Sequence, residues 1–91
     1  DLRGCDFSQA NFMKCDLRGA VFTESTLDRA IFMQADLTGA RLPKLSAKYA
    51  CFAEANLHQA VLVGSDLRHA ILPQARATLA DFTAADLRKT V

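Results

Sequence analysis

The chain has 91 residues, of which 51% are hydrophobic and 23% are charged, and its formal net charge at pH 7 is +1. This length is enough for one small domain, and the near-neutral charge argues against both a strongly basic nucleic-acid binder and an acidic mimic of nucleic acid. No apolar run reaches the roughly 18 residues of a membrane-spanning helix, so we expect no membrane association.

The three cysteines, Cys5, Cys15 and Cys51, are too few and too irregularly spaced for a disulfide framework or a zinc site. We interpret them as small core or surface residues in a reducing compartment, which predicts a cytoplasmic location. A secreted or lumenal location stays open, because the chain begins at Asp1 without an initiator methionine and fits a fragment of a longer protein.

From its first residues the chain repeats every five positions. The blocks 5–9, 10–14, 15–19 and 35–39 share one template: a small residue, Asp or Asn, Leu or Phe, and two further, mostly polar residues. Sixteen of the eighteen positions 2, 7, 12 and onward to 87 are Leu or Phe, and seventeen of the eighteen positions 5, 10, 15 and onward to 90 are Ala, Ser, Cys or Thr. Seven of the eight Asp share a third column, and the glycines and the prolines each keep to one further column.

A period of five fits neither an amphipathic α-helix nor an alternating strand. The bulky and small residues are two positions apart, so a short extended piece carries both on its inner side, and a turn follows each piece. Glycine at one constant position fits a turn residue with positive φ. Four such sides close a coil of 20 residues, and the chain then forms about four and a half coils. The Ala-Val-Phe of 20–22 recurs 40 residues later as the Ala-Val-Leu of 60–62, which supports this closure.

The whole chain resembles the pentapeptide-repeat family, whose template is A(D/N)LXX. The resemblance implies an all-β fold, a right-handed quadrilateral parallel β-helix, which we expect residues 1–91 to form as a single domain. It also implies that the bulky and small columns point inward. The predicted core is Leu2, Phe7, Phe12, Leu17, Phe22, Leu27, Phe32, Leu37, Leu42, Phe52, Leu57, Leu62, Leu67, Leu72, Phe82 and Leu87.

Two blocks depart from the template. In block 45–49, Leu45 stands at the small position and Ala47 at the bulky one. In block 75–79, Ala77 stands at the bulky position and the large residue, Leu79, comes two positions later. We interpret the first exchange as a local repacking or a bulge, and we expect a distorted corner at both blocks.

No catalytic or metal-binding constellation is visible, so we expect a non-enzymatic protein without a cofactor, a metal or a small-molecule substrate. His58 and His69 lie in outward columns without a phased nucleophile, and Ser25 and Ser65 lie in the inward small column, where burial is expected. The Asp column is interpreted as turn-forming, because Asp and Asn accept hydrogen bonds from nearby backbone amides. Asp-Leu-Arg motifs at 1–3, 16–18, 66–68 and 86–88 predict charge pairs two residues apart.

Sorting the outward residues by side gives two polar faces, one mixed face and one apolar face. On the apolar face the template Asp or Asn is replaced by Ile31, Cys51, Ile71 and Val91 in successive coils. A contiguous apolar stripe usually marks an interface, whereas the alternative is that β-branched residues simply suit parallel strands. The predicted interaction face is Met13, Ile31, Met33, Cys51, Ala53, Ile71, Pro73 and Val91.

We therefore predict a structural or protein–protein interaction module that presents this face to a protein partner or to a second copy. The alternative, taken from the family resemblance, is a DNA-mimicking protein that interacts with gyrase, which the short length and near-neutral charge disfavour. The open first and last coils leave two further alternatives, a chain that continues beyond these residues and copies that stack end to end.

Overall fold

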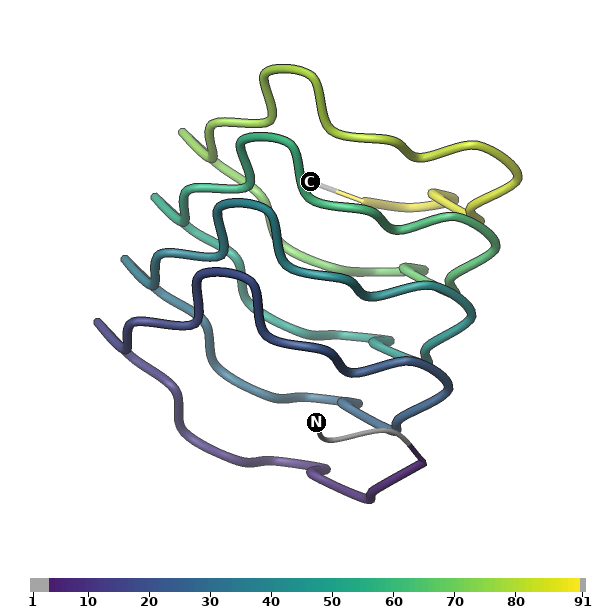
Figure 1. Ribbon diagram of the computed structural model, residues 1–91. Helices are drawn as coiled ribbons and strands as arrows, with labels where there is room; N and C mark the ends of the chain where they lie inside the picture. Colours follow the sequence, from purple (N-terminus) through teal and green to yellow (C-terminus); the bar gives the residue numbers. More distant parts are fainter. Residues whose placement is uncertain (1–3, 91) are drawn as a thin grey trace.

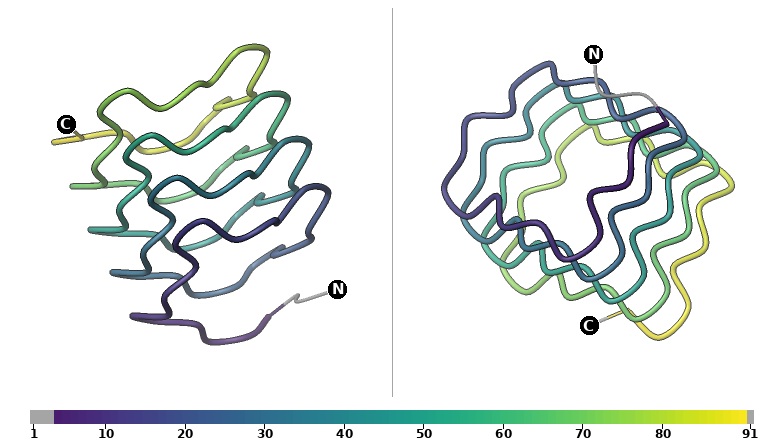
Figure 2. Two further views of the ribbon diagram at one scale, coloured as in Figure 1. Left: turned by 90° about the vertical axis from the view of Figure 1, so that its left-hand side faces the viewer. Right: turned by 90° about the horizontal axis from the view of Figure 1, so that it is seen from below.

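The computed structural model describes residues 4–90, which wind around one axis as a stack of similar coils (Figure 1). Seen from below, the coils are four-sided and repeat one outline, each displaced slightly from the one before (Figure 2). Parallel bridges join residues 20 positions apart, from Asp6 with Thr26 to Asp66 with Asp86, and they recur every five residues. This pairing agrees with the predicted closure of each coil after 20 residues.

Within residues 4–90 the backbone forms neither a helix nor a strand of consecutive paired residues, and this part of the chain holds no helix capable of crossing a membrane. Each side contributes one isolated parallel bridge, at the residue before the bulky one. The turn in every block redirects the chain after a single paired residue. The expected β architecture is therefore built from columns of single bridges rather than from strands.

In block 35–39 every backbone donor has a partner. The N–H of Ala35 closes the preceding turn at 3.0 Å, and the N–H of Asp36 bonds to the previous coil at 3.0 Å. The N–H groups of Leu37 and Gly39 bond to carbonyls of the next coil at 2.7 and 2.8 Å. The last donor, the N–H of Thr38, bonds to the Asp36 side chain at 3.1 Å. The template Asp or Asn thus completes the hydrogen bonding of its own block.

Each turn places one residue in the left-handed region of φ. All described residues at positions 4, 9, 14 and onward to 89 have φ between 56° and 69°, and most of them are not glycine. A left-handed conformation costs a non-glycine residue roughly 1–2 kcal/mol, so the ladder of hydrogen bonds imposes it on Gln, Glu, Lys and Arg alike. The positive φ predicted at the glycine position is confirmed.

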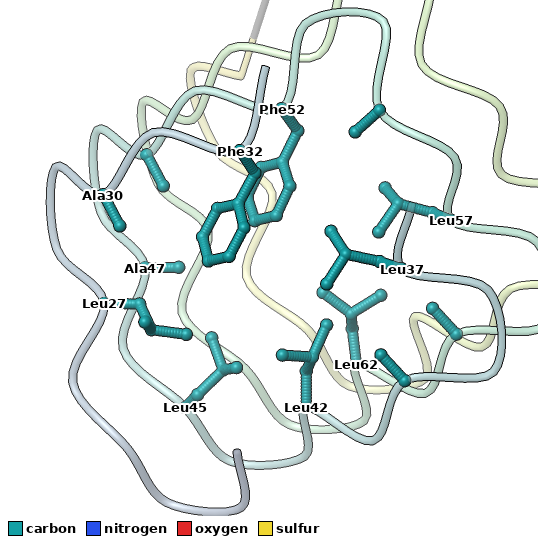
Figure 3. Close-up of a cluster of buried hydrophobic side chains, with 14 of the residues drawn as sticks. Leu27, Ala30, Phe32, Leu37, Leu42, Leu45, Ala47, Phe52, Leu57 and Leu62 are labelled. Atoms are coloured by element: carbon teal, nitrogen blue, oxygen red, sulfur yellow. The ribbon is translucent and has the colours of Figure 1, made fainter. Parts of the chain in front are cut away.

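The bulky and small columns point toward the axis and form one core (Figure 3). The predicted core residues of the middle coils are buried: Phe22, Leu27, Phe32, Leu37, Leu42, Phe52, Leu57, Leu62 and Leu67. Nearer the ends, five others are half-buried and pack against this core: Phe7, Phe12, Leu17, Leu72 and Phe82. Leu87 is 41% exposed and is not among the residues that pack against the core, which corrects its assignment to the core; near the end of the described residues fewer side chains surround it. Leu2 lies outside the described residues.

Three phenylalanines stack along one inner side of the core. The ring centroids of Phe12 and Phe32 are 5.2 Å apart, and those of Phe32 and Phe52 are 4.9 Å apart, with interplanar angles of 11° and 3°. Figure 3 shows the parallel rings of Phe32 and Phe52 projecting into the interior. The rings occupy equivalent positions of successive coils, so their separation follows the ~4.8 Å spacing of paired backbones.

Block 45–49 keeps its register despite the exchange of its large and small residues. Ser46 forms parallel bridges to the coils on both sides, and Leu45 and Ala47 are 2% and 0% exposed. The core is therefore repacked at nearly constant volume, and no bulge forms. The corner before the block does change, because the N–H of Leu45 bonds to the Ser65 hydroxyl at 3.2 Å, whereas the equivalent N–H of regular blocks bonds to a backbone carbonyl.

Block 75–79 also stays in register, because Arg76 bridges to Asn56. Ala77 takes the bulky position, and its carbonyl accepts the N–H of Ala80 at 3.0 Å to close the next turn. Leu79 occupies the left-handed turn position with φ of 60° and is 72% exposed. The expected distorted corner is wrong for this block, because the backbone is regular and the leucine lies on the surface.

Candidate interaction surface

The parallel bridges assemble the predicted apolar face. Asn11, Ile31, Cys51 and Ile71 bridge in succession, so they stand in one column on one side of the solenoid. Two positions later in the same blocks follows a second column: Met13, Met33, Ala53 and Pro73. Val91, the last predicted member of the face, lies outside the described residues. We refer to the described members of these two columns as the apolar face.

The apolar face is partly exposed. Met13 and Ile71 are 43% and 40% exposed, and Pro73 is also exposed. The residues of the middle coils, such as Ile31 and Cys51, are half-buried, because each is flanked by its equivalents in the coils above and below, ~4.8 Å away. Apart from Asn11 in the first described coil, the apolar face consists of aliphatic and sulfur-containing side chains.

An apolar residue at the template position cannot accept the backbone N–H two residues later, as Asp and Asn do. In block 10–14 the N–H of Met13 bonds to the Asn11 side chain at 2.9 Å. Ile31 and Ile71 have no side-chain oxygen to play this part. After Ile71 the residue in question is Pro73, which has no N–H to satisfy. Turn formation therefore does not explain why these positions are apolar.

One edge of the apolar face carries a row of polar side chains at the turn position, basic or aromatic from Arg29 onward. We call it the corner row: Gln9, Arg29, Tyr49, His69 and Lys89. The rings of Tyr49 and His69 stack with centroids 4.6 Å apart and an interplanar angle of 1°. The Arg29 guanidinium carbon lies 4.7 Å from the centroid of the Tyr49 ring. This row was not predicted from the sequence, because turn positions carry polar residues in most blocks. The available signal is the recurrence of basic or aromatic residues at intervals of 20 from Arg29 onward.

The polar faces are built on the Asp and Asn column. Each described Asp or Asn of this column accepts the N–H two residues later, at 2.9–3.2 Å, which confirms their interpretation as turn-forming. The pKa values of Asp16 and Asp86 are lowered to about 2, first by side-chain hydrogen bonds from Arg18 and Arg88 and then by the backbone N–H groups of the same arginines. Both kinds of bond favour the charged carboxylate.

The predicted Asp–Arg pairs form wherever the structure describes them. The carboxylate and guanidinium groups approach to 2.7 Å at 16–18, to 2.8 Å at 66–68 and to 2.7 Å at 86–88. The fourth motif, at 1–3, lies outside the described residues. Pairs as exposed as these contribute only ~0–1 kcal/mol each to stability, so they fix side-chain orientation more than they stabilise the fold.

The remaining candidate residues lie where their columns place them. Ser25 and Ser65 are each 1% exposed, as predicted, which assigns them to the core rather than to an accessible site. His58 projects from a polar face, two residues after the bridging position, and His69 belongs to the corner row. No group of three or more His, Cys, Asp and Glu side chains in residues 4–90 is arranged to hold a metal ion.

Residues 1–39 and 50–90 match the family model of pentapeptide repeats, in 8 copies. The chain is similar to the solved structure of Rfr23, a pentapeptide repeat protein from the cyanobacterium Cyanothece 51142, with a TM-score of 0.95 and 26% identity over 98% of this chain and 61% of that one. It is also similar to a pentapeptide repeat protein from the thylakoid lumen of Arabidopsis thaliana, with a TM-score of 0.61 and 34% identity over 97% of this chain and 68% of that one. A search of curated proteins gave no match. The solved structures support a right-handed β-helix.

Proposed function

The chain belongs to the pentapeptide-repeat family, and from this premise we propose that it is a non-enzymatic module that binds a partner protein, or a second copy of itself, through its apolar face. In this proposal residues 1–91 form one domain, a quadrilateral solenoid of about four and a half coils of 20 residues. The domain acts as a regular surface that positions side chains for recognition.

The column of Ile31, Cys51 and Ile71 carries the proposal. Parallel bridges hold these residues in successive coils, and each stands where the family template has a residue that bonds to its own turn. Exposed hydrocarbon is unfavourable in water by roughly 25 cal/mol per Å² of surface. Burial against a partner removes this cost, and contiguous apolar patches on monomeric proteins are rare for the same reason.

The corner row supports the same face as a recognition surface. Protein interfaces combine an apolar centre with Tyr and Arg residues that carry much of the binding energy. Tyr49 is 49% exposed although its ring is held between Arg29 and His69. A ring that is already fixed loses little conformational entropy when a partner binds. Tyr49 is therefore a pre-ordered aromatic residue at the edge of the apolar face.

Replacing Ile31 and Ile71 together by lysine tests the proposal. The matched control replaces Val21 and Val61 by lysine, because these residues hold the equivalent bridging position on the mixed face. We expect the Ile31→Lys/Ile71→Lys variant to lose self-association in sedimentation experiments, or partner capture when the immobilised chain is the bait, while the control retains both. Equal behaviour of the two variants would refute the role of this face.

A cytoplasmic location remains part of the proposal, and the Arabidopsis relative comes from a thylakoid lumen. The net charge of +1 gives no support to the alternative of an acidic DNA mimic directed at gyrase, because such a mimic needs a strongly negative surface. Inhibition of gyrase supercoiling by the purified chain is the measurement that would favour that alternative.

A further inference from the structure

A small surface pocket opens beside the corner row, on the side of the later coils. Its volume is about 180 Å³, and its lining residues are Arg68, His69, Arg88 and Lys89, so no carboxylate lines it. Clefts that enclose whole small molecules usually start at roughly 300 Å³. This pocket is therefore suited to one charged group of a ligand rather than to an entire ligand.

The two guanidinium groups of the pocket are oriented by their own aspartates. The Nε and Nη2 atoms of Arg68 donate to Asp66 at 2.9 and 2.8 Å, and the same atoms of Arg88 donate to Asp86 at 2.9 and 2.7 Å. Asp66 and Asp86 are bridging residues of adjacent coils, so the guanidinium groups stand one coil apart. Side chains that are already fixed lose less entropy when a ligand binds.

Each guanidinium keeps one binding edge. Its five N–H donors form a planar fork, and among the described residues no partner bonds to Nη1 of Arg68 or of Arg88. The edge formed by Nη1 and the second hydrogen of Nη2 is the one that grips an oxyanion through two parallel bonds. Hydrogen bonds with Asp86 raise the pKa of Arg88, while desolvation and then the nearby positive charge of Arg68 lower it.

We propose that this pocket is a binding site for a phosphate group, held between Arg68 and Arg88 and completed by Lys89 and His69. A carboxylate has two oxygens and is satisfied by one guanidinium fork. A phosphate monoester offers three acceptor oxygens and close to two negative charges, which match two forks and an ammonium group. Added salt should weaken this binding, because the pocket is open to solvent and dissolved ions screen the attraction between the phosphate and the basic side chains.

A single-stranded nucleic acid fits this corner less well than a small phosphate compound. Proteins that bind single strands present open aromatic faces on which the bases stack. Here Arg29 covers one face of Tyr49 and His69 covers the other, because they come from the coils before and after it. None of the lining residues belongs to the apolar face, although His69 and Lys89 also belong to the corner row. The Ile31→Lys/Ile71→Lys variant should therefore keep phosphate binding even where it loses association.

Amide NMR spectra of the full chain, titrated with inorganic phosphate at constant ionic strength, test the proposal. We expect saturable shifts confined to the lining residues, and much weaker effects from acetate. The variant His69→Gln/Lys89→Gln should bind phosphate more weakly, by about two- to five-fold for each residue. Glutamine is the matched replacement, because four glutamines of the chain already occupy this turn position with φ between 58° and 64°.

The control variant is Lys14→Gln/Lys44→Gln, which removes two charges from turn positions at other corners with φ of 59° and 56°. It should bind phosphate like the unmodified chain. Shifts that do not saturate, acetate binding equal to phosphate binding, or an equal loss in the control would each overturn the proposal. A second titration with adenosine monophosphate separates the sources: tighter binding than inorganic phosphate identifies a phosphate ester as the ligand, and equal binding identifies free phosphate.

Discussion

The side-chain hydroxyl of Ser65 accepts a hydrogen bond at 3.2 Å from the backbone N–H of Leu45, a residue of the preceding coil. The same hydroxyl donates to the carbonyl of Leu42 at 2.5 Å. The hydroxyl thereby bridges the N–H of Leu45 and the carbonyl of Leu42. At regular corners the equivalent N–H and carbonyl bond directly to each other. The atypical block 45–49 is thus accommodated by a buried serine supplied from the next coil.

Replacing Ser65 by alanine should lower the free energy of unfolding by about 1–3 kcal/mol, because buried backbone groups at Leu42 and Leu45 lose their partner. Urea unfolding followed by circular dichroism measures this loss. The double variant Leu45→Ala/Ala47→Leu restores the template, so its corner should close by the ordinary turn bond and Ser65→Ala should cost less in that background. An equal cost in both backgrounds would contradict the bridging role.

Asp28 is the one aspartate outside the Asp column. It accepts a backbone N–H of the next coil, whereas each described aspartate of the column accepts a backbone N–H of its own block. Its Oδ1 accepts the Ser46 hydroxyl at 2.6 Å and the N–H of Lys48 at 3.0 Å. Replacing Asp28 by alanine should reduce the free energy of unfolding by about 1–2 kcal/mol. Adding Ser46→Asn should recover much of this loss, since an asparagine at the template position can bond to the N–H of Lys48 itself. Failure of this rescue in urea titrations would count against the assignment.

The columns were predictable from the sequence because a coil of 20 residues and a period of five place residues such as Ile31 and Phe32 on defined sides. The bonds of Ser65 and Asp28 were not predictable, because they depend on which side chain of a neighbouring coil reaches an atypical block. The stack of Tyr49 on His69 depends in the same way on side-chain rotamers at a corner. Leu87 shares its column with the buried leucines of the middle coils, but its exposure depends on the packing in the last coil, which the column does not specify.

Replacing Leu79 by asparagine should raise the free energy of unfolding by up to about 1 kcal/mol, because asparagine adopts the left-handed region more readily than leucine. Leu79 has φ of 60° and is 72% exposed, so little packing is lost. The reverse control, Gly39→Leu, introduces a bulky side chain at φ of 67° and should destabilise the fold. Thermal unfolding compares the two variants, and a lower midpoint for Leu79→Asn than for the unmodified chain would contradict the prediction.

The fold should lose stability in acid because its carboxylates are more acidic in the folded state than in the unfolded one. The pKa values of Asp16 and Asp86 fall from 3.8 to about 2, and those of Asp6, Asp36 and Asp66 are also lowered, chiefly by side-chain hydrogen bonds. An aspartate in the unfolded chain takes up a proton near pH ~4, so the unfolded state binds more protons between about pH 4 and pH 2. The stabilisation is therefore complete above the unfolded pKa and is lost as the pH falls toward the folded pKa.

Urea midpoints measured from about pH 6 down to pH 2 should accordingly stay level at first and then fall below about pH 4. The variant Asp16→Asn/Asp86→Asn isolates the effect, because asparagine can still accept the N–H groups of Arg18 and Arg88 but carries no charge to titrate. Its midpoint should decline less steeply with acid than that of the unmodified chain. If the midpoints of the two proteins decline in parallel, Asp16 and Asp86 do not carry the pH dependence. Their pKa values would then be the same in the folded and unfolded states.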